Sequence, residues 1–342
     1  MFMSLRAYGW LVPGLLSCAM LSACSGPHGS GTKYRVAVIP KGTSHDFWKF
    51  IHAGAVAAAR ERGDIEAIWD GPAKEDLRHE QQQIVERFTT EHVDAIVLAP
   101  CDRQTLVHPV ERAIEERIPV VVMDSGLDLP NSILGDDRYL GYIATDNRRG
   151  GAEAGIRMQE LLKGKEHRKV MMIRYQAGSE STEQREEGFR TFMRGISSIT
   201  FIEARDEAGA TADSAQKVAE RLLSDNKDLD GIFTPNESST VGTLRALEVL
   251  HRTGEVKLVG FDSSEILIQA LRAGKLHGLV LQDPFGMGYL SVMRAADFLT
   301  GQPIPRDRTK YTELKVATRE NMNEPAIKAL YARDLGQYLN SQ

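Results

Sequence analysis

The fold is decided by residues 34–63, YRVAVIPKGTSHDFWKFIHAGAVAAARERG. The run from Tyr34 to Ile39 is apolar and rich in β-formers, which predicts a buried strand. From Phe47 to Arg62, small and apolar residues recur at helical spacing, and Gly63 follows them as a typical C-cap. A strand followed at once by a helix is the building unit of parallel sheets, so this stretch predicts an α/β fold.

The same alternation of strands and helices continues along the rest of the chain. Further strands are expected at 65–69, 95–99, 120–123, 169–174, 200–204, 231–234, 257–261 and 279–281, and further helices at 75–91, 105–117, 182–193, 212–224, 238–251 and 264–273. Strands that are almost continuously apolar belong to parallel sheets covered by helices on both faces. Two similar halves therefore predict two doubly wound, Rossmann-like lobes, each offering the carboxyl ends of its strands to a ligand.

The first 23 residues have the character of an export signal. Arg6 supplies a positive charge, and the apolar run at 11–20 is shorter than the ~20 residues that span a bilayer. The stretch 21–24, LSAC, resembles the bacterial lipobox, which implies that Cys24 becomes the lipidated first residue of the mature chain. An ordinary secretory signal with a chance cysteine is the alternative. Residues 25–32, rich in Gly and Ser, are expected to be a flexible tether, and the body is expected on the periplasmic or extracellular face.

The composition describes a globular body with a substantial core, because 42% of residues are hydrophobic and 26% are charged. A net charge of −5, with both signs mixed along the chain, does not favour nucleic-acid binding. Cys101 is the one cysteine left besides Cys24 after the signal is removed, and we interpret it as a buried or strand-end residue. No dinucleotide, phosphate-loop or His-Glu-x-x-His motif is present, so we expect no enzyme activity, no cofactor and no metal site.

Planar polar and aromatic residues follow the predicted strands. They are Lys41, His45, Phe47 and Trp48 after the first strand, then Asp124, Arg185, Asn236, Asp262 and Gln282. Carboxylates, amides and guanidinium groups bind vicinal hydroxyls, and aromatic rings stack on the C–H faces of sugars. Taken singly, such aromatic residues belong to the hydrophobic core more often than to a ligand site, and such Asp or Asn residues are more often helix caps than ligand-binding groups. Their coincidence at one edge of both lobes favours a sugar site.

The body at 33–320 resembles periplasmic binding proteins of the ribose/galactose/glucose-binding type, the type I fold that LacI-type repressors also use as an effector domain. The resemblance is carried by residues 39–48, 95–100, 118–124, 144–147, 184–189, 234–237, 259–262 and 280–284. It implies two lobes joined by a three-strand hinge, with crossings near Thr145–Asn147, Gln282–Pro284 and Lys310–Leu314. The first lobe would comprise 33–145 and 283–310, and the second 146–282 and 311–342.

The resemblance also assigns roles. Phe47 and Trp48 would form the stacking platform, and His45 takes the place of a sugar-binding Asn. Hydroxyls would be bound by Asp124 from the first lobe and by Arg185, Asn236, Asp262 and Gln282 from the second lobe and hinge. Ser125 stands where ribose binders usually have Arg, and Lys41 and His45 also depart from the ribose pattern. These departures favour a glucose-like hexose, with a polyol or a charged sugar derivative left open.

Members of this family deliver a monosaccharide to an ABC permease in the inner membrane, and a monomer is their usual state. A sensory or autoinducer-binding receptor would use the same fold with another membrane partner. An exported oxidoreductase is the alternative from a different class. A DNA-binding repressor would need a helix-turn-helix ahead of Lys33, where the export signal stands instead.

Overall fold

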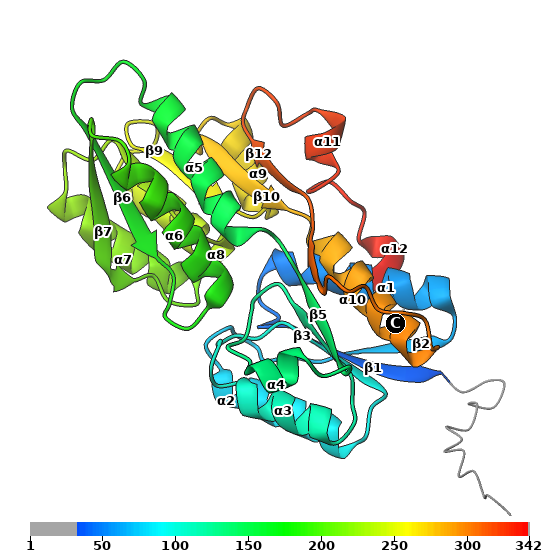
Figure 1. Ribbon diagram of the computed structural model, residues 1–342. Coiled ribbons are helices and arrows are strands. Elements are labelled where there is room, and N and C mark those ends of the chain that lie inside the picture. The colour runs from blue at the N-terminus through cyan, green and yellow to red at the C-terminus, as the bar shows by residue number, and fades with distance from the viewer. Residues whose placement is uncertain (1–32, 341–342) are drawn as a thin grey trace, which may run out of the picture. The chain divides into compact units, whose positions relative to one another are not determined.

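The computed structural model describes residues 33–340, which form two six-stranded sheets (Figure 1). The predicted signal, lipobox and tether lie outside the described residues. Sheet A has the order β11-β5-β4-β3-β1-β2 and contains β1 (Tyr34–Ile39), β2 (Ile65–Trp69), β3 (Ala95–Leu98), β4 (Val120–Met123), β5 (Tyr139–Ala144) and β11 (Thr309–Tyr311). Sheet B has the order β12-β10-β9-β8-β6-β7 and contains β6 (Arg168–Arg174), β7 (Ile199–Glu207), β8 (Gly231–Phe233), β9 (Lys257–Phe261), β10 (Gly278–Gln282) and β12 (Leu314–Ala317).

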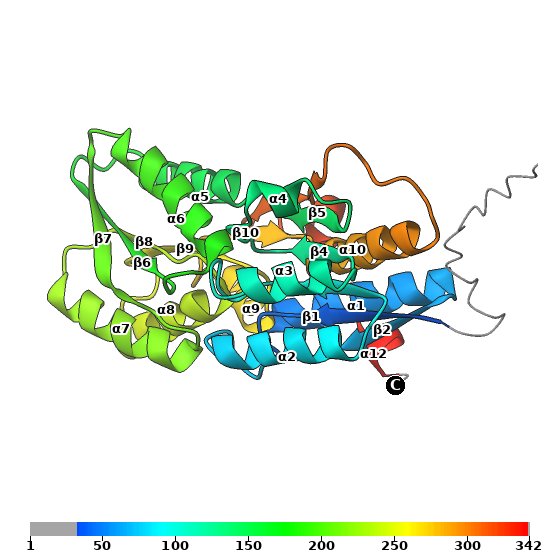
Figure 2. The same cartoon turned by 60° about the horizontal axis from the view of Figure 1, so that its bottom comes forward.

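Helices cover both faces of each sheet (Figure 2). The first lobe is sheet A with α1 (Asp46–Arg62) and α10 (Pro284–Leu299) on one face, α2 (Arg78–Thr90) and α3 (Val107–Glu115) on the other, and the short α4 (Asn131–Leu134). The second lobe is sheet B with α5 (Asn147–Leu161) and α6 (Glu180–Arg194) on one face, and α7 (Ala212–Asp225), α8 (Glu237–Val249), α9 (Glu265–Arg272) and α11 (Pro325–Lys328) on the other. No helix among residues 33–340 is long and apolar enough to cross a membrane.

The continuous apolar character of the strands follows from this two-sided cover. In β1, Val36 and Val38 pack into the cluster beneath α1 and α10, whereas Ala37 and Ile39 pack into the cluster beneath α2 and α3. Because successive side chains point to opposite faces, a strand covered on both sides has no position left for a polar residue. The predicted α/β class with two doubly wound lobes is confirmed.

Most predicted elements are confirmed to within a few residues at their ends. The strand at Tyr34–Ile39 is found as predicted, and Gly63 ends α1 with a left-handed φ of 73° and an N–H bonded to the Ala59 carbonyl. The helix expected from residue 75 begins only at Arg78, so Glu75 lies in the preceding loop. The elements β5, α5 and α10 were not among those predicted from the sequence.

The chain passes from sheet A to sheet B after β5, returns after β10 and leaves again after β11. β12 pairs antiparallel with β10, which departs from the otherwise parallel pairing of the described strands. The lobe boundaries stay a proposal, but α12 (Gly336–Leu339) needs a correction. It was expected in the second lobe and lies instead against α1, because Arg60 donates hydrogen bonds to the Gln337 and Tyr338 carbonyls at 2.6 and 3.0 Å.

Two helix pairs touch backbone to backbone beside the passages between the lobes. In the pair α1–α10, a Cβ on Gly54 would stand 2.0 Å from the Phe285 carbonyl oxygen. In the pair α5–α6, a Cβ on Gly151 would stand 1.9 Å from the Arg185 carbonyl oxygen. Both α5 and α10 begin directly after the chain has changed lobes, so these tight pairs hold each lobe rigid next to its connections.

Candidate functional site

One cavity lies between the carboxyl ends of the two sheets, and nine of the ten residues predicted to bind a ligand line it. The lining residues are Lys41, His45, Phe47, Trp48, Glu75, Asp124, Ser181, Thr182, Arg185, Asn236, Asp262 and Gln282. Its volume is about 20 Å³, which is room for about one water molecule. The cavity is therefore nearly filled by the side chains that form it.

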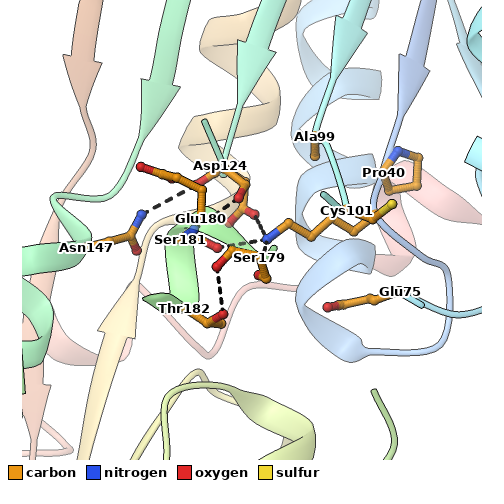
Figure 3. A network of polar contacts seen from close by, with 12 residues as sticks. Pro40, Glu75, Ala99, Cys101, Asp124, Asn147, Ser179, Glu180, Ser181 and Thr182 are labelled. Carbon is orange, nitrogen blue, oxygen red and sulfur yellow. Dashed lines mark hydrogen bonds and ion pairs between the residues drawn. The ribbon is translucent and has the colours of Figure 1, made fainter. Parts of the chain in front are cut away.

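Lys41 connects the two lobes at one end of the cavity. Its ammonium group lies 2.9 Å from a carboxylate oxygen of Asp124, at the end of β4 in the first lobe. It also donates to the Ser181 and Ser179 hydroxyls of the second lobe, at 2.8 and 3.4 Å. Figure 3 shows Asp124 gathered with Ser179 and Ser181 at this point. An ammonium has three donors, so these contacts use all of them, and Lys41 orients Asp124 rather than offering a free donor.

Glu75 is a buried acceptor at the centre of the first-lobe wall. One of its oxygens accepts from His45 Nδ1 and Trp48 Nε1, both at 2.8 Å. The other accepts from the Tyr175 hydroxyl of the second lobe, also at 2.8 Å. Burial alone would raise the pKa of this carboxyl, but His45, Lys41 and Trp48 outweigh it and lower the pKa to about 2. Burial opposes the charge on His45, yet Glu75 raises the pKa of that imidazole to about 9. The pair is ionised at neutral pH.

The two aromatic residues form an edge of the same wall. The rings of Phe47 and Trp48 meet at 87° with their centroids 5.0 Å apart, a favourable edge-to-face geometry. Trp48 is 2% exposed and fixed by its bond to Glu75, whereas Phe47 is half-buried. Both rings line the cavity and both also pack against the core beneath α1, so they belong to the core, and their role as a stacking platform stays a prediction.

Arg185 organises the wall of the second lobe. Its guanidinium lies over the Phe261 ring at 4.2 Å and donates to Asn147 Oδ1 at 2.8 Å and to Gln282 Oε1 at 2.9 Å. Gln282 in turn donates to Asp262 at 2.5 Å. Burial raises the pKa of Asp262, and the charge of Arg185 opposes that rise. The Arg185 guanidinium and the Gln282 amide are thus held in place by hydrogen bonds to each other, to Asp262 and to Asn147, which preorganises them for a ligand.

Asp124 and Asp262 occupy equivalent positions in the two sheets. Each directly follows a strand, β4 or β9, and each adopts a left-handed backbone, with φ of 62° and 72°. Each backbone N–H is bonded to the neighbouring strand, to the Ile143 and Val280 carbonyls respectively. A left-handed backbone costs roughly 1 kcal/mol for a residue with a Cβ, and strain of this kind is concentrated at functional sites.

Two of the residues predicted to bind the ligand form hydrogen bonds to other parts of the protein. Asn236 lines the cavity, but its side-chain oxygen caps α8 by accepting from the Ser239 N–H at 3.2 Å, as the capping interpretation expected. Ser125 is not part of the lining: its hydroxyl accepts from the Ser181 N–H at 3.1 Å, across the lobes. Cys101 is fully buried, as predicted, and burial raises the pKa of its thiol to about 12.

Glu237, at the start of α8, was not predicted. Its carboxylate accepts from the backbone N–H groups of Asp46 and Phe47 at 3.3 and 3.2 Å, at the N-terminus of α1 in the other lobe. Burial, reinforced by Asp262 and opposed by His45, raises the pKa of Glu237 to about 7. A second-lobe carboxyl therefore caps a first-lobe helix and titrates near neutrality.

Glu75, Ser181 and Thr182 were also missed. Each lies at or near the start of a helix, where acidic and hydroxyl residues are common for local reasons, so nothing in the local sequence sets them apart. Among residues 33–340 the structure has no cluster of His, Cys, Asp or Glu suited to a metal ion.

This fold and site define a two-lobed solute-binding protein, and the comparison with known families agrees. Residues 36–303 match the periplasmic binding protein domain, and the chain belongs to that family. Its relatives include the D-ribose/D-allose-binding protein of Pseudomonas aeruginosa, 26% identical over 312 residues that cover 88% of this chain and 96% of the relative. These relatives are solute-binding proteins, not enzymes, which removes the oxidoreductase alternative.

Solved structures give the same result. A periplasmic component of an ABC-type sugar transport system from Hahella chejuensis is 32% identical, with a TM-score of 0.76 over 83% of this chain and 99% of its own. An ABC transporter solute-binding protein from Agrobacterium vitis, with bound D-fucose, is 30% identical, with a TM-score of 0.81 over 87% of this chain and 99% of its own. The predicted resemblance to sugar-binding proteins of the type I fold is confirmed.

Proposed function

We propose that this protein is the sugar receptor of an ABC importer. It takes up a monosaccharide between its lobes on the outer side of the inner membrane and presents it to the permease. Lipidated Cys24 holds it at the membrane, and a monomer is sufficient for this role. The single observation that carries the proposal is the cavity, where polar and aromatic side chains from both lobes meet at the carboxyl ends of two parallel sheets.

The charges around the cavity favour an uncharged sugar. Lys41 is paired with Asp124, His45 with Glu75, and Asp262 lies in the field of Arg185. Each charged lining group is thus balanced, and a carboxylate or phosphate on the ligand would find no unpaired cation. Of the ligands left open by the sequence, a neutral hexose or polyol suits this balance better than a charged derivative.

Capture requires the lobes to move apart. The cavity has room for about one water molecule, and Lys41, Tyr175 and Glu237 each form a hydrogen bond or ion pair from one lobe to the other. A sugar would enter an open form and then replace part of this interlobe network with its own hydroxyls. Contacts on both lobes would favour the closed form, which is the form that docks on a permease.

A thermal-shift screen of monosaccharides, polyols and sugar acids tests the proposal. We expect one neutral six-carbon sugar to raise the melting temperature, because a ligand that binds only the native state stabilises it. Calorimetry then gives the affinity. If only sugar acids raise the melting temperature, the argument from charge balance is wrong, and if no member of the panel does, the sugar-receptor proposal is wrong. Genes for a permease and ATPase beside this gene, rather than a histidine kinase, would separate importer from sensor.

A further inference from the structure

We propose that the cleft contains a second subsite, next to the first, that takes a second sugar ring joined glycosidically to the sugar in the cavity. This inference rests on the proposed function and extends the ligand class to disaccharides and other glycosides. The subsite is a groove between the lobes with a volume of about 310 Å³. It is lined by Ser44, His45, Asp46 and Lys74 of the first lobe and by Ala210, Thr211, Ala212, Glu237, Ser238, Val241, Arg245, Ser264 and Ile266 of the second.

The groove adjoins the cavity. His45 lines both, and the second-lobe wall passes from Asn236 in the cavity to Glu237 and Ser238 in the groove. A substituent on a sugar bound in the cavity would therefore enter the groove beside His45. The groove, at about 310 Å³, has room for a second ring, whereas the cavity, at about 20 Å³, is closely filled by its own side chains.

The lining has the mixed chemistry of a sugar subsite. Val241 and the half-exposed Ile266 give an apolar wall, suited to the C–H face of a ring, and Ser44, Ser238 and Thr211 bring hydroxyl groups to the same groove. Two of the charged members are paired outside the groove: Asp46 binds Lys49 at 2.7 Å, and Arg245 binds Asp213 at 3.1 Å, whereas Lys74 is exposed at the edge of the first lobe. The hydroxyl groups beside an apolar wall are what suit this groove to an uncharged sugar ring.

Ser264 supplies an independent indication of a ligand. It is 2% exposed and lines the groove, yet its hydroxyl has no hydrogen-bond partner within the described part of the chain. It stands at the N-cap of α9 but makes no side-chain capping bond. A buried hydroxyl without a partner is uncommon in native proteins, because the lost hydration is not replaced. A hydroxyl of a second ring in the groove would provide that partner.

The test compares each sugar with its own glycosides. Calorimetry on the full mature body would use D-glucose, D-galactose, D-allose, D-fucose, D-ribose and D-arabinose, then the phenyl glycosides and disaccharides of whichever sugar binds. Ile266→Trp fills the groove from an exposed position, and Val249→Trp, 57% exposed on α8 and outside the groove, is the matched control. Ser264→Ala removes the unpartnered hydroxyl.

We expect at least one glycoside to bind within about ten-fold of its parent sugar or more tightly. Ile266→Trp should weaken that glycoside by about ten-fold or more and the parent sugar by less than about three-fold, whereas Val249→Trp should change neither. Ser264→Ala should weaken the glycoside by about five-fold, the loss of one hydrogen bond. If every glycoside binds much more weakly than its parent, or if Ile266→Trp affects both alike, the subsite is refuted and the receptor proposal stands. If no sugar and no glycoside binds, the receptor proposal itself fails.

Discussion

The ion pair between His45 and Glu75 allows a quantitative prediction. Replacing Glu75 with Gln keeps the shape of the side chain but removes its charge. His45 then loses the carboxylate that holds it protonated, and the Trp48 and Tyr175 donors keep only a neutral acceptor. Breaking one partner of a buried pair is costly, because the other charge is left without compensation.

The two pKa values give the same magnitude for this pair. The pKa of His45 rises from 6.5 to about 9, and that of Glu75 falls from 4.5 to about 2. At about 1.4 kcal/mol for each pKa unit, either shift corresponds to roughly 3 kcal/mol of stability. Both shifts contain the interaction between His45 and Glu75, so they are not added, although Lys41 and Trp48 also contribute to the shift of Glu75. We expect Glu75→Gln to lower the free energy of unfolding by roughly 3 kcal/mol at pH 6.

The pH dependence follows from the directions of the shifts. The raised pKa of His45 contributes stability in full below pH 6.5, and this is lost as the pH rises through 9. The lowered pKa of Glu75 contributes in full above pH 4.5, and this is lost as the pH falls through 2. The difference between the wild type and the variant should therefore be largest between pH 4.5 and 6.5, should shrink as the pH rises from 6.5 to 9, and should be smallest above pH 9.

Urea unfolding of the mature body measures this difference. The tryptophans that remain after residue 23, Trp48 and Trp69, both belong to the first lobe, so fluorescence reports on the lobe that holds the pair. Circular dichroism gives the second signal, since Trp48 touches Glu75 directly. A double-mutant cycle with His45→Gln isolates the coupling. A coupling below about 1 kcal/mol at pH 6, or a difference that is as large at pH 9 as at pH 6, would refute the reasoning.

Three further predictions test the site and the fold. Asp262→Ala and Trp48→Ala should each weaken sugar binding by about a hundred-fold or more in calorimetry, because they remove a strand-end carboxylate and a wall of the cavity; unchanged affinity would remove the site assignment. The change in the free energy of unfolding from wild type to Glu237→Gln should be more favourable at pH 8 than at pH 5. The pKa of about 7 means that the wild type buries a charged carboxylate at pH 8, which costs stability, and the variant does not; an equal change at both pH values contradicts this. Gly54→Val should destabilise the protein by about 3 kcal/mol or more in urea unfolding, since even a Cβ would stand 2.0 Å from the Phe285 carbonyl oxygen, and a stable variant would mean that α1 and α10 can separate.

The sequence was sufficient for the architecture because hydrophobic periodicity reports directly on which faces are covered. The apolar runs in β1, β3 and β4 are short and rich in β-branched residues, which indicates strands buried on both sides. β5 was missed because its sequence, YLGYIA, contains a glycine at φ 112°, which interrupts an otherwise strand-like run. The position of α12 could not be predicted, since a four-residue helix has no periodicity to read.

The site was predictable where side chains follow strands and not where they enter from loops. Asp124 and Asp262 were found because a polar residue after an apolar strand must lie at the sheet edge. Glu75 was interpreted as the first residue of a charged amphipathic helix, and only the tertiary structure buries it between His45 and Tyr175. Glu237 was missed for a related reason, because its partners belong to a helix 190 residues away along the chain.

The position of α12 against α1 has a practical consequence for biosensors. β1 and α12 stand at opposite ends of the described chain, yet both belong to the first lobe. Two fluorescent proteins fused to these ends would both be attached to the first lobe, so the energy transfer between them would not change when the lobes close. One fluorophore inserted at the loop after α7 in the second lobe, paired with one at the carboxyl end, would instead change its distance whenever the lobes rotate.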